Sequence, residues 1–141
     1  MTHNEELLFK DLSAKLPYGV KVEIDGLDGI HEMDSINIII DQNGCKCAEV
    51  KVAKYNVYYP IIKVKPYLRD FEDMTESEFD EHEKYVFPIF DMASSESIPA
   101  GTLVDDAHKV TEFYDSHLFD TRSLLKLKLA KKAEEGFYDF K

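Results

Sequence analysis

The residues of this 141-residue chain whose types and spacing could do chemistry are carboxylates concentrated in one segment. Residues 70–84 read DFEDMTESEFDEHEK and contain eight acidic side chains. An unpaired charge is very costly to bury, so a run of this density must face water or a cationic partner. These side chains form the candidate partner-binding surface: Asp70, Glu72, Asp73, Glu76, Glu78, Asp80, Glu81 and Glu83.

The same segment dominates the charge of the whole chain. The formal net charge is −11, and residues 70–120 hold fifteen Asp and Glu against two Lys, a net of −13. Three interpretations stay open: a solvated surface, a docking surface that steers a basic protein, and mimicry of nucleic acid by carboxylates in place of phosphates. Like charges at Glu76 and Asp80 disfavour a helix, whereas a helix dipole favours acidic residues in its first turn. Direct binding of nucleic acid is not expected, because phosphates would repel the chain.

A second candidate site consists of polar residues near the segment and towards the C-terminus. Arg69 and Arg122 are the only arginines, and a guanidinium can bind a ligand carboxylate or phosphate through two parallel hydrogen bonds. Together with Tyr114 and His117 they predict a small enzyme or a ligand-binding protein if all four converge in one pocket. The favoured interpretation, however, is that the two arginines are structural anchors. Their expected partners in that case are Asp70 and Asp120.

Other chemistry has weaker support. Cys45 and Cys47 are expected to share one face of a strand, but a zinc site needs about four ligands and the sequence has no further cysteine. His82 and His108 each follow an acidic residue at helical spacing, yet neither belongs to an HExxH motif. The GxSxG, GxxxxGK[ST], GxGxxG and CxxC motifs are absent. We therefore expect no metal, no cofactor and no catalytic residue, and a binding protein is favoured over an enzyme.

The first half of the chain predicts a helix followed by strands. An i, i+4, i+8 stripe of leucines predicts a helix over 4–16, which Pro17 ends. Alternating valine and isoleucine predict a strand over 19–25. The sequence DGLDG predicts a turn over 25–29.

The strongest local signal is Asn43-Gly44 between two alternating segments. It predicts a β-hairpin over 35–53 closed by a type I′ turn, because Asn and Gly tolerate the two positive φ angles of that turn. A further extended stretch over 55–64 contains Pro60, which suits an edge strand. Together these segments predict an antiparallel sheet of three or four strands.

The second half predicts helices. Thr75 followed by Glu78 has the spacing of a capping box, which predicts a helix over 76–86. The small residues of 91–101 predict a flexible linker.

The capping pattern recurs at Thr102, before an amphipathic helix over 103–118. A last helix is predicted over 121–134, starting at Asp120. The predicted fold is thus a single α+β domain, 1–141, in which a small antiparallel sheet packs against three or four helices.

Composition supports one domain with a real core. Hydrophobic residues make up 44% and aromatic residues 12%, and a chain of this length buries about two-thirds of its unfolded surface. The segment MTHNEELLF has neither a basic region nor a long apolar run, so we expect no signal peptide, no membrane span and a cytoplasmic location.

Three segments together resemble a group of uncharacterised small proteins of phages, prophages and mobile elements of gut anaerobic bacteria. The segments are KDLSAKLPYGVKV (Lys10–Val22), KPYLRDFEDMTESE (Lys65–Glu78) and FYDSHLFDTRSLL (Phe113–Leu125). Members of that group read LPYGV near the start, PYLR followed by MTEEE in the middle, and HxxDxRGL near the end. This chain is more acidic over 70–73, and Ser123 stands where glycine is usual. The resemblance implies a small protein of a mobile genome in a bacterial host and carries over no catalytic residue.

These observations favour a non-enzymatic, acidic protein-binding module of phage or mobile-element origin that engages a host or phage protein through the 70–83 carboxylates. The expected partner is a protein, basic or nucleic-acid-binding. Three alternatives stay open: an anti-defence inhibitor that mimics nucleic acid, a small enzyme or ligand-binding protein around Arg69 and Arg122, and a structural or virion-assembly protein. The sequence does not predict the oligomeric state.

Overall fold

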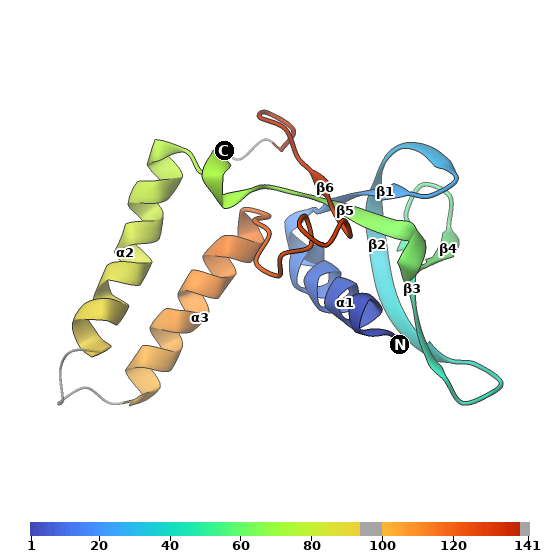
Figure 1. Cartoon of the computed structure of the whole chain (residues 1–141), viewed down its shortest axis with the longest axis horizontal. Coiled ribbons are helices and arrows are strands. Elements are labelled where there is room, and N and C mark those ends of the chain that lie inside the picture. Colours follow the sequence, from blue (N-terminus) through green and yellow to red (C-terminus); the bar gives the residue numbers. More distant parts are fainter. Residues whose placement is uncertain (94–99, 139–141) are drawn as a thin grey trace.

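A computed structural model describes residues 1–93 and 100–138 of the chain (Figure 1). The fold is α+β, as the sequence predicts, and its described part contains three α-helices and six strands. The helices are α1 (His3–Lys15), α2 (Glu76–Ala93) and α3 (Ala100–Ser116). The strands are β1 (Lys21–Ile24), β2 (Leu27–Ile40), β3 (Lys46–Val52), β4 (Val57–Pro60), β5 (Val64–Leu68) and β6 (Lys131–Lys132).

The strands form one mixed sheet in the order β4-β3-β2-β1-β5-β6. All neighbours pair antiparallel except β5 and β6, which are parallel. The predicted number of strands, three or four, was therefore too small, and the sheet is mixed where a fully antiparallel one was predicted. Pro60 lies in the edge strand β4, as its missing N–H requires.

The chain between β2 and β3 does not form the predicted two-residue turn. The strands pair antiparallel from Ile40 opposite Lys46 onward, but only Gly44 of the Asn-Gly pair has a positive φ, +80°. The carboxylate of Asp41 accepts hydrogen bonds from the backbone N–H groups of Asn43 and Cys45, both at 2.9 Å. These bonds stabilise a longer turn in which Gly44 N–H donates to the Asp41 carbonyl oxygen at 3.0 Å.

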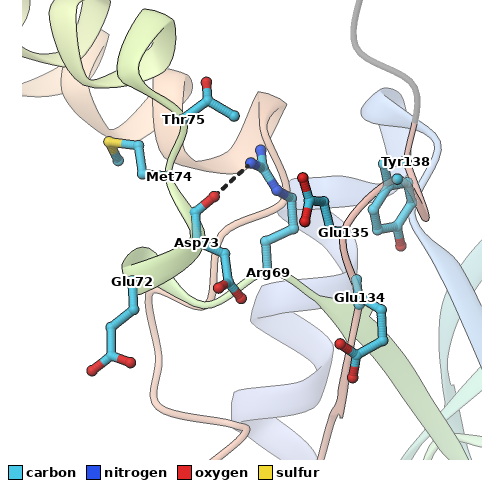
Figure 2. Close-up of a pocket in the computed structure, with 10 residues that line it drawn as sticks. Arg69, Glu72, Asp73, Met74, Thr75, Glu134, Glu135 and Tyr138 are labelled. Carbon is cyan, nitrogen blue, oxygen red and sulfur yellow. Dashed lines mark hydrogen bonds between the residues drawn. The ribbon is translucent and has the colours of Figure 1, made fainter.

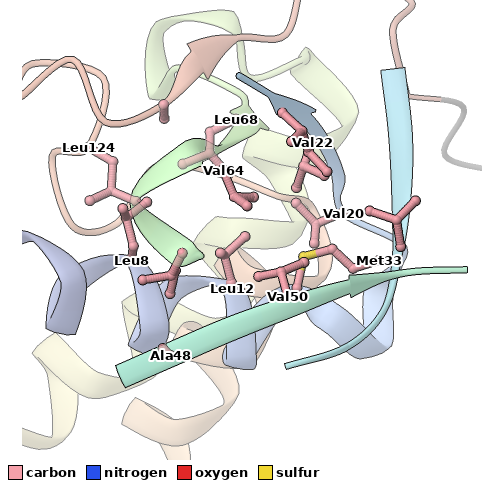
Figure 3. Close-up of a cluster of buried hydrophobic side chains, with 14 of the residues drawn as sticks. Leu8, Leu12, Val20, Val22, Met33, Ala48, Val50, Val64, Leu68 and Leu124 are labelled. Carbon is pink, nitrogen blue, oxygen red and sulfur yellow. The ribbon is translucent and has the colours of Figure 1, made fainter. Parts of the chain in front are cut away.

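Helix α1 covers one face of the sheet. Its capping box is complete: Glu5 N–H donates to the Thr2 hydroxyl at 3.2 Å, and the Glu5 carboxylate reaches back to Thr2. Leu8 and Leu12 are almost fully buried and pack against the aliphatic side chains of the sheet (Figure 3). Predicted over 4–16, the helix ends at Lys15, and Pro17 lies in the 3-10 turn that follows.

Helices α2 and α3 run antiparallel and project from the side of the sheet (Figure 1). We call this pair the helical arm. At its base, Arg69 N–H donates to the Leu118 carbonyl oxygen and Asp120 N–H donates to the Arg69 carbonyl oxygen, both at 2.9 Å. The arm is thus attached to the end of β5 by backbone hydrogen bonds.

The start of α2 is as predicted, and the bounds of the arm differ in three places. The capping box is present: Glu78 N–H donates to the Thr75 hydroxyl at 3.2 Å, and Thr75 N–H donates to the Glu78 carboxylate at 3.0 Å. Helix α2 continues past residue 86 to Ala93. Of the linker predicted over 91–101, both ends are helical and residues 94–99 lie outside the described residues. Helix α3 starts before Thr102, which is therefore not its N-cap.

Helix α3 ends in a left-handed residue that is not glycine. Leu118 has φ +61° and is fully buried. Its N–H donates to the Asp115 carbonyl oxygen at 3.1 Å, and Phe119 N–H donates to the Tyr114 carbonyl oxygen at 3.0 Å. These two bonds are those of a Schellman motif, which stops the helix short of the predicted residue 118.

The helix predicted over 121–134 does not form. Asp120 does cap the turns that follow it, since its carboxylate accepts hydrogen bonds from the N–H groups of Leu124 and Leu125 at 2.8 and 3.0 Å. However, the turns that follow end at Lys128, which has φ +61°. The next residues form β6, and Ala133 N–H donates to the Leu68 carbonyl oxygen at 2.8 Å. Pairing with the edge of β5 replaces helical hydrogen bonds.

Candidate functional site

Seven of the eight carboxylates in the acidic segment lie at the surface. The segment forms a 3-10 turn, Phe71–Asp73, and the first half of α2. We call these seven residues the acidic surface. Five are exposed and two half-buried: Glu72, Asp73, Glu76, Asp80 and Glu83, then Asp70 and Glu81.

Helical geometry gathers part of this surface on one side of α2. At roughly 100° per residue, Glu76, Asp80 and Glu83 fall within about 60° of one another. A hollow of about 870 Å³ beside them is lined by Glu76, Asp80 and Glu81, together with Lys84. The hollow thus joins Glu81 to the carboxylates on this side of α2.

Only weak ion pairs reduce its charge among the described residues. The Asp73 carboxylate lies 3.4 Å from the Lys132 ammonium, and both side chains are nearly half exposed. Glu83 lies 3.9 Å from His82, which is charged only when protonated. Exposed pairs of this kind contribute about 0–1 kcal/mol. The surface therefore keeps most of its negative charge.

Glu78, the eighth carboxylate, points inward. Its two oxygens lie 2.6 Å from the two Nη atoms of Arg69, and both side chains are only about a tenth exposed. Burial alone would raise the pKa of Glu78, but the hydrogen bonds and charge of Arg69 and the N–H of Thr75 lower it to about 2. Glu78 is therefore ionised at neutral pH and committed to Arg69.

Arg69 connects the sheet to both helices of the arm. Its guanidinium carbon lies 4.5 Å from the centre of the Phe119 ring, and its Nη1 donates to the His117 carbonyl oxygen at 3.3 Å. We call Arg69, Glu78, His117 and Phe119 the Arg69 cluster. Arg69 is thus a structural anchor, as one of the two interpretations expected, but its carboxylate partner is Glu78 and not Asp70.

A pocket of about 390 Å³ lies beside the Arg69 cluster (Figure 2). Carboxylates surround the Arg69 side chain there, and the Asp73 carbonyl oxygen accepts a hydrogen bond from it at 3.4 Å. Four acidic residues line the pocket: Glu72, Asp73, Glu134 and Glu135. Because Glu78 already neutralises the guanidinium, this pocket does not suit a carboxylate or phosphate ligand.

The four polar candidates do not converge in one pocket. Arg69 and His117 meet at Glu78, with His117 Nε2 3.9 Å from its carboxylate. The Tyr114 hydroxyl shares a 2.7 Å hydrogen bond with His82 Nε2. Arg122 binds other carboxylates, and the pocket that Arg69 lines includes none of the other three candidates.

Arg122 belongs to a buried group of charges that ties α1 to α3. Its Nη1 lies 3.0 Å from the Asp11 carboxylate and 3.8 Å from that of Asp115. The ammonium of Lys15 pairs with Asp11 and lies 3.4 Å from Asp115. We call these four residues the Arg122 cluster. The two acidic and two basic groups of the cluster balance in charge. Arg122 is therefore a structural anchor, and its carboxylate partners are Asp11 and Asp115 instead of the expected Asp120.

Burial within this cluster acts on the pKa of Asp11. Desolvation raises the pKa of Asp11, and the charges of Lys15 and Arg122 oppose that rise.

The Arg122 cluster was not predicted from the sequence, although the sequence contains a signal for it. Asp11 and Lys15 occupy the i+3 and i+7 positions of the stripe that begins at Leu8, so both had to face the core.

The cysteines and histidines form no metal site in the described part of the chain. Cys45 is an exposed residue of the turn before β3, and Cys47 is half-buried on the strand face opposite Ala48. Both thiols are free. No group of three or more His, Cys, Asp or Glu residues in the described ranges is arranged to hold a metal ion.

Comparisons with known proteins give no family assignment. No family model matches the chain, and searches of curated proteins and of solved structures find no similar protein. Among the described helices, none combines the length and apolar character needed to cross a bilayer.

Proposed function

We propose that this chain is a non-enzymatic protein-binding module whose acidic surface engages a basic partner protein. The observation that supports this proposal most is the inward position of Glu78. The arginine next to the acidic segment is neutralised inside the fold by that one carboxylate. The remaining seven carboxylates keep their charge at the surface, on the first half of α2 and the turn before it.

Electrostatics supports a basic partner. A concentrated patch of one sign raises the association rate of an oppositely charged protein and suppresses like-charged competitors. A nucleic-acid-binding protein is one partner of this kind, since its basic groove is complementary to carboxylates spaced along a helix. Competition between the chain and DNA or RNA for that partner would identify mimicry of nucleic acid. The resemblance described above would place the partner among host or phage proteins, and this part of the proposal rests on the resemblance alone.

The test compares two variants with the same change in charge. In the surface variant, exposed carboxylates of the acidic surface are neutralised: Glu72→Gln, Glu76→Gln, Asp80→Asn and Glu83→Gln. In the control variant, exposed carboxylates of α1, of β2 and of the turn between β1 and β2 are neutralised: Glu6→Gln, Asp25→Asn, Asp28→Asn and Glu32→Gln. Glu78 is left unchanged in both, because its loss would damage the fold.

Tagged forms of the wild type and both variants are used to capture partners from bacterial lysate at moderate salt. We expect a stoichiometric partner with the wild type and the control variant, and its loss with the surface variant. The affinity of the purified partner should fall with added salt, because the screening length shortens from about 30 Å at 0.01 M to about 8 Å at 0.15 M. Equal capture by all three forms would contradict the proposal.

A further inference from the structure

Four aromatic side chains form a continuous strip beside the acidic surface. The ring centres of Phe79 and His82 are 6.4 Å apart, those of His82 and Tyr114 5.4 Å, and those of Tyr114 and Phe71 5.0 Å. We call Phe79, His82, Tyr114 and Phe71 the aromatic strip. It crosses from α2 to α3 and on to the turn before α2.

Both ends of the strip are open to solvent. Phe79 is 52% exposed and Phe71 is 40% exposed, although the fold buries Phe113 and Phe119 a short distance away. Aromatic side chains, phenylalanine among them, are enriched in protein interfaces. A few such residues often supply most of the binding free energy of an interface.

Carboxylates of the acidic surface flank the strip. Glu76 and Glu83 lie three residues before and four residues after Phe79, which places all three on neighbouring positions of the same side of α2. Glu72 directly follows Phe71. A group that binds the rings therefore lies within reach of several carboxylates.

The Arg69 cluster shows which chemistry fits this arrangement. There a guanidinium lies 4.5 Å from the centre of the Phe119 ring while its Nη atoms bind the Glu78 carboxylate at 2.6 Å. Phe71 stacks on the same Phe119 ring, with centres 5.1 Å apart and an interplanar angle of 9°. The fold thus already pairs one arginine with a ring and a carboxylate next to the Phe71 end of the strip.

We infer that the aromatic strip receives an arginine side chain of the partner protein, which stacks on Phe79 and pairs with the flanking carboxylates. This inference rests on the proposed function, because it names the group that the basic partner presents. Arginine fits better than lysine, since its planar guanidinium stacks on a ring and binds a carboxylate at the same time. A second copy of the chain is a poorer occupant, because each copy carries a net charge of −11.

The test uses two short fluorescent peptides of equal length and charge, one rich in arginine and the other with lysine at every arginine position. Fluorescence anisotropy gives the Kd of each peptide for the wild type, for Phe79→Leu, for the charge-neutralised surface variant and for Tyr55→Leu. Tyr55→Leu is the matched control. Tyr55 is an aromatic residue that is 44% exposed, and it lies between β3 and β4, outside the aromatic strip. Leucine keeps the apolar volume and removes the aromatic face. Thermal unfolding checks that each variant is folded.

We expect the wild type and Tyr55→Leu to bind the arginine peptide about fivefold more tightly than the lysine peptide, which corresponds to about 1 kcal/mol. The preference arises because a guanidinium stacks on the ring and pairs with a carboxylate at the same time. Phe79→Leu should lose that preference, and the surface variant should bind both peptides more weakly. Equal binding of both peptides by the wild type, with Phe79→Leu unchanged, overturns the inference. If the surface variant is still weakened, the proposed function stands without it.

Two other outcomes also decide the question. No binding of either peptide up to millimolar concentration would overturn the inference together with the electrostatic basis of the proposed function. Sedimentation that shows a dimer of the wild type and a monomer of Phe79→Leu would assign the strip to a second copy of the chain, and would equally overturn the inference.

Discussion

Arg69 and Glu78 form a bidentate salt bridge at the base of the helical arm, in which each guanidinium Nη atom lies 2.6 Å from one carboxylate oxygen. Arg69 follows β5 and Glu78 lies in the first turn of α2, so the pair fixes the direction in which the arm leaves the sheet. The same carboxylate also caps α2 through the N–H of Thr75. One side chain thus anchors the arm and begins its first helix.

The pair makes stability depend on pH in a defined direction. The pKa of Glu78 falls from an ordinary value of 4.5 to about 2 in the folded chain, so the folded state favours the ionised form. The stabilisation of the fold by ionised Glu78 is fully present above the pKa of the unfolded chain. It is lost as the pH falls from about 5 towards 2. We expect Glu78→Gln to lower the free energy of unfolding by about 3 kcal/mol at pH 7, with most of the difference from wild type lost by pH 2.

Urea unfolding of both proteins between pH 2 and 7 measures this difference. Glu76→Gln is the control, because Glu76 lies in the same helical turn but is exposed. Its effect should be within about 0.5 kcal/mol of wild type at every pH. A constant offset between Glu78→Gln and wild type across the whole range would argue against a charged Glu78 in the pair.

The Arg122 cluster predicts strong coupling between Asp11 and Lys15, whose side chains are fully buried. Lys15→Met leaves Asp11 with too little positive charge and should destabilise the fold by about 3–5 kcal/mol. The double variant Asp11→Leu/Lys15→Met removes both charges and leaves Arg122 beside Asp115. It should lie within about 1 kcal/mol of wild type, because a buried pair contributes little relative to apolar side chains of similar size.

Chemical unfolding of wild type, both single variants and the double variant completes the cycle. The coupling free energy should be at least about 2 kcal/mol. Additive effects of the two substitutions would show that the cluster does not act as a unit.

Local signals in the sequence predicted the elements that depend on neighbouring residues. The start of α2 at Thr75 was correct because a capping box is complete within four positions. The predicted type of the turn between β2 and β3 was wrong. The Asp41 carboxylate accepts hydrogen bonds from N–H groups that a type I′ turn would leave free. An aspartate before Asn-Gly is therefore the signal that should have favoured the longer turn.

Elements that depend on distant residues could not be predicted in this way. Leucines over 124–129 alternate with lysines and suit a helix end, but the edge of β5 offers backbone partners to Lys131 and Lys132. Nothing local to that segment indicates a free strand edge more than sixty residues earlier. The same limit applied to the site: the density of carboxylates was evident, whereas the inward turn of Glu78 depends on Arg69 being placed beside it by the fold.

At Leu118 we expect the glycine variant to be more stable than the alanine variant, the reverse of the usual order. Leu118 is fully buried but adopts φ +61°, a conformation that costs an L-residue about 1–2 kcal/mol. Leu118→Ala loses the burial and keeps the strain, with an expected destabilisation of about 2–5 kcal/mol. Leu118→Gly loses the same burial and relieves the strain, so we expect it to be more stable than Leu118→Ala by about 1 kcal/mol.

Leu124 provides the matched control, because it is also fully buried but is not among the residues with positive φ. There the ordinary order should hold, with glycine less stable than alanine. Urea midpoints of the four variants test both orders together. If glycine is the worse substitution at both positions, the Schellman conformation at Leu118 is not strained.

Ser123 also has a positive φ, +57°, and its side chain is exposed. Ser123→Gly should raise the free energy of unfolding by about 0.5–1 kcal/mol, because glycine adopts this conformation without a steric penalty. Ser123→Val should lower it by more than about 1 kcal/mol, since a β-branched side chain is the least tolerant of positive φ. Thermal and urea unfolding at pH 7 measure both changes, and a loss of stability in Ser123→Gly would mean that the serine hydroxyl contributes more than the strain removes.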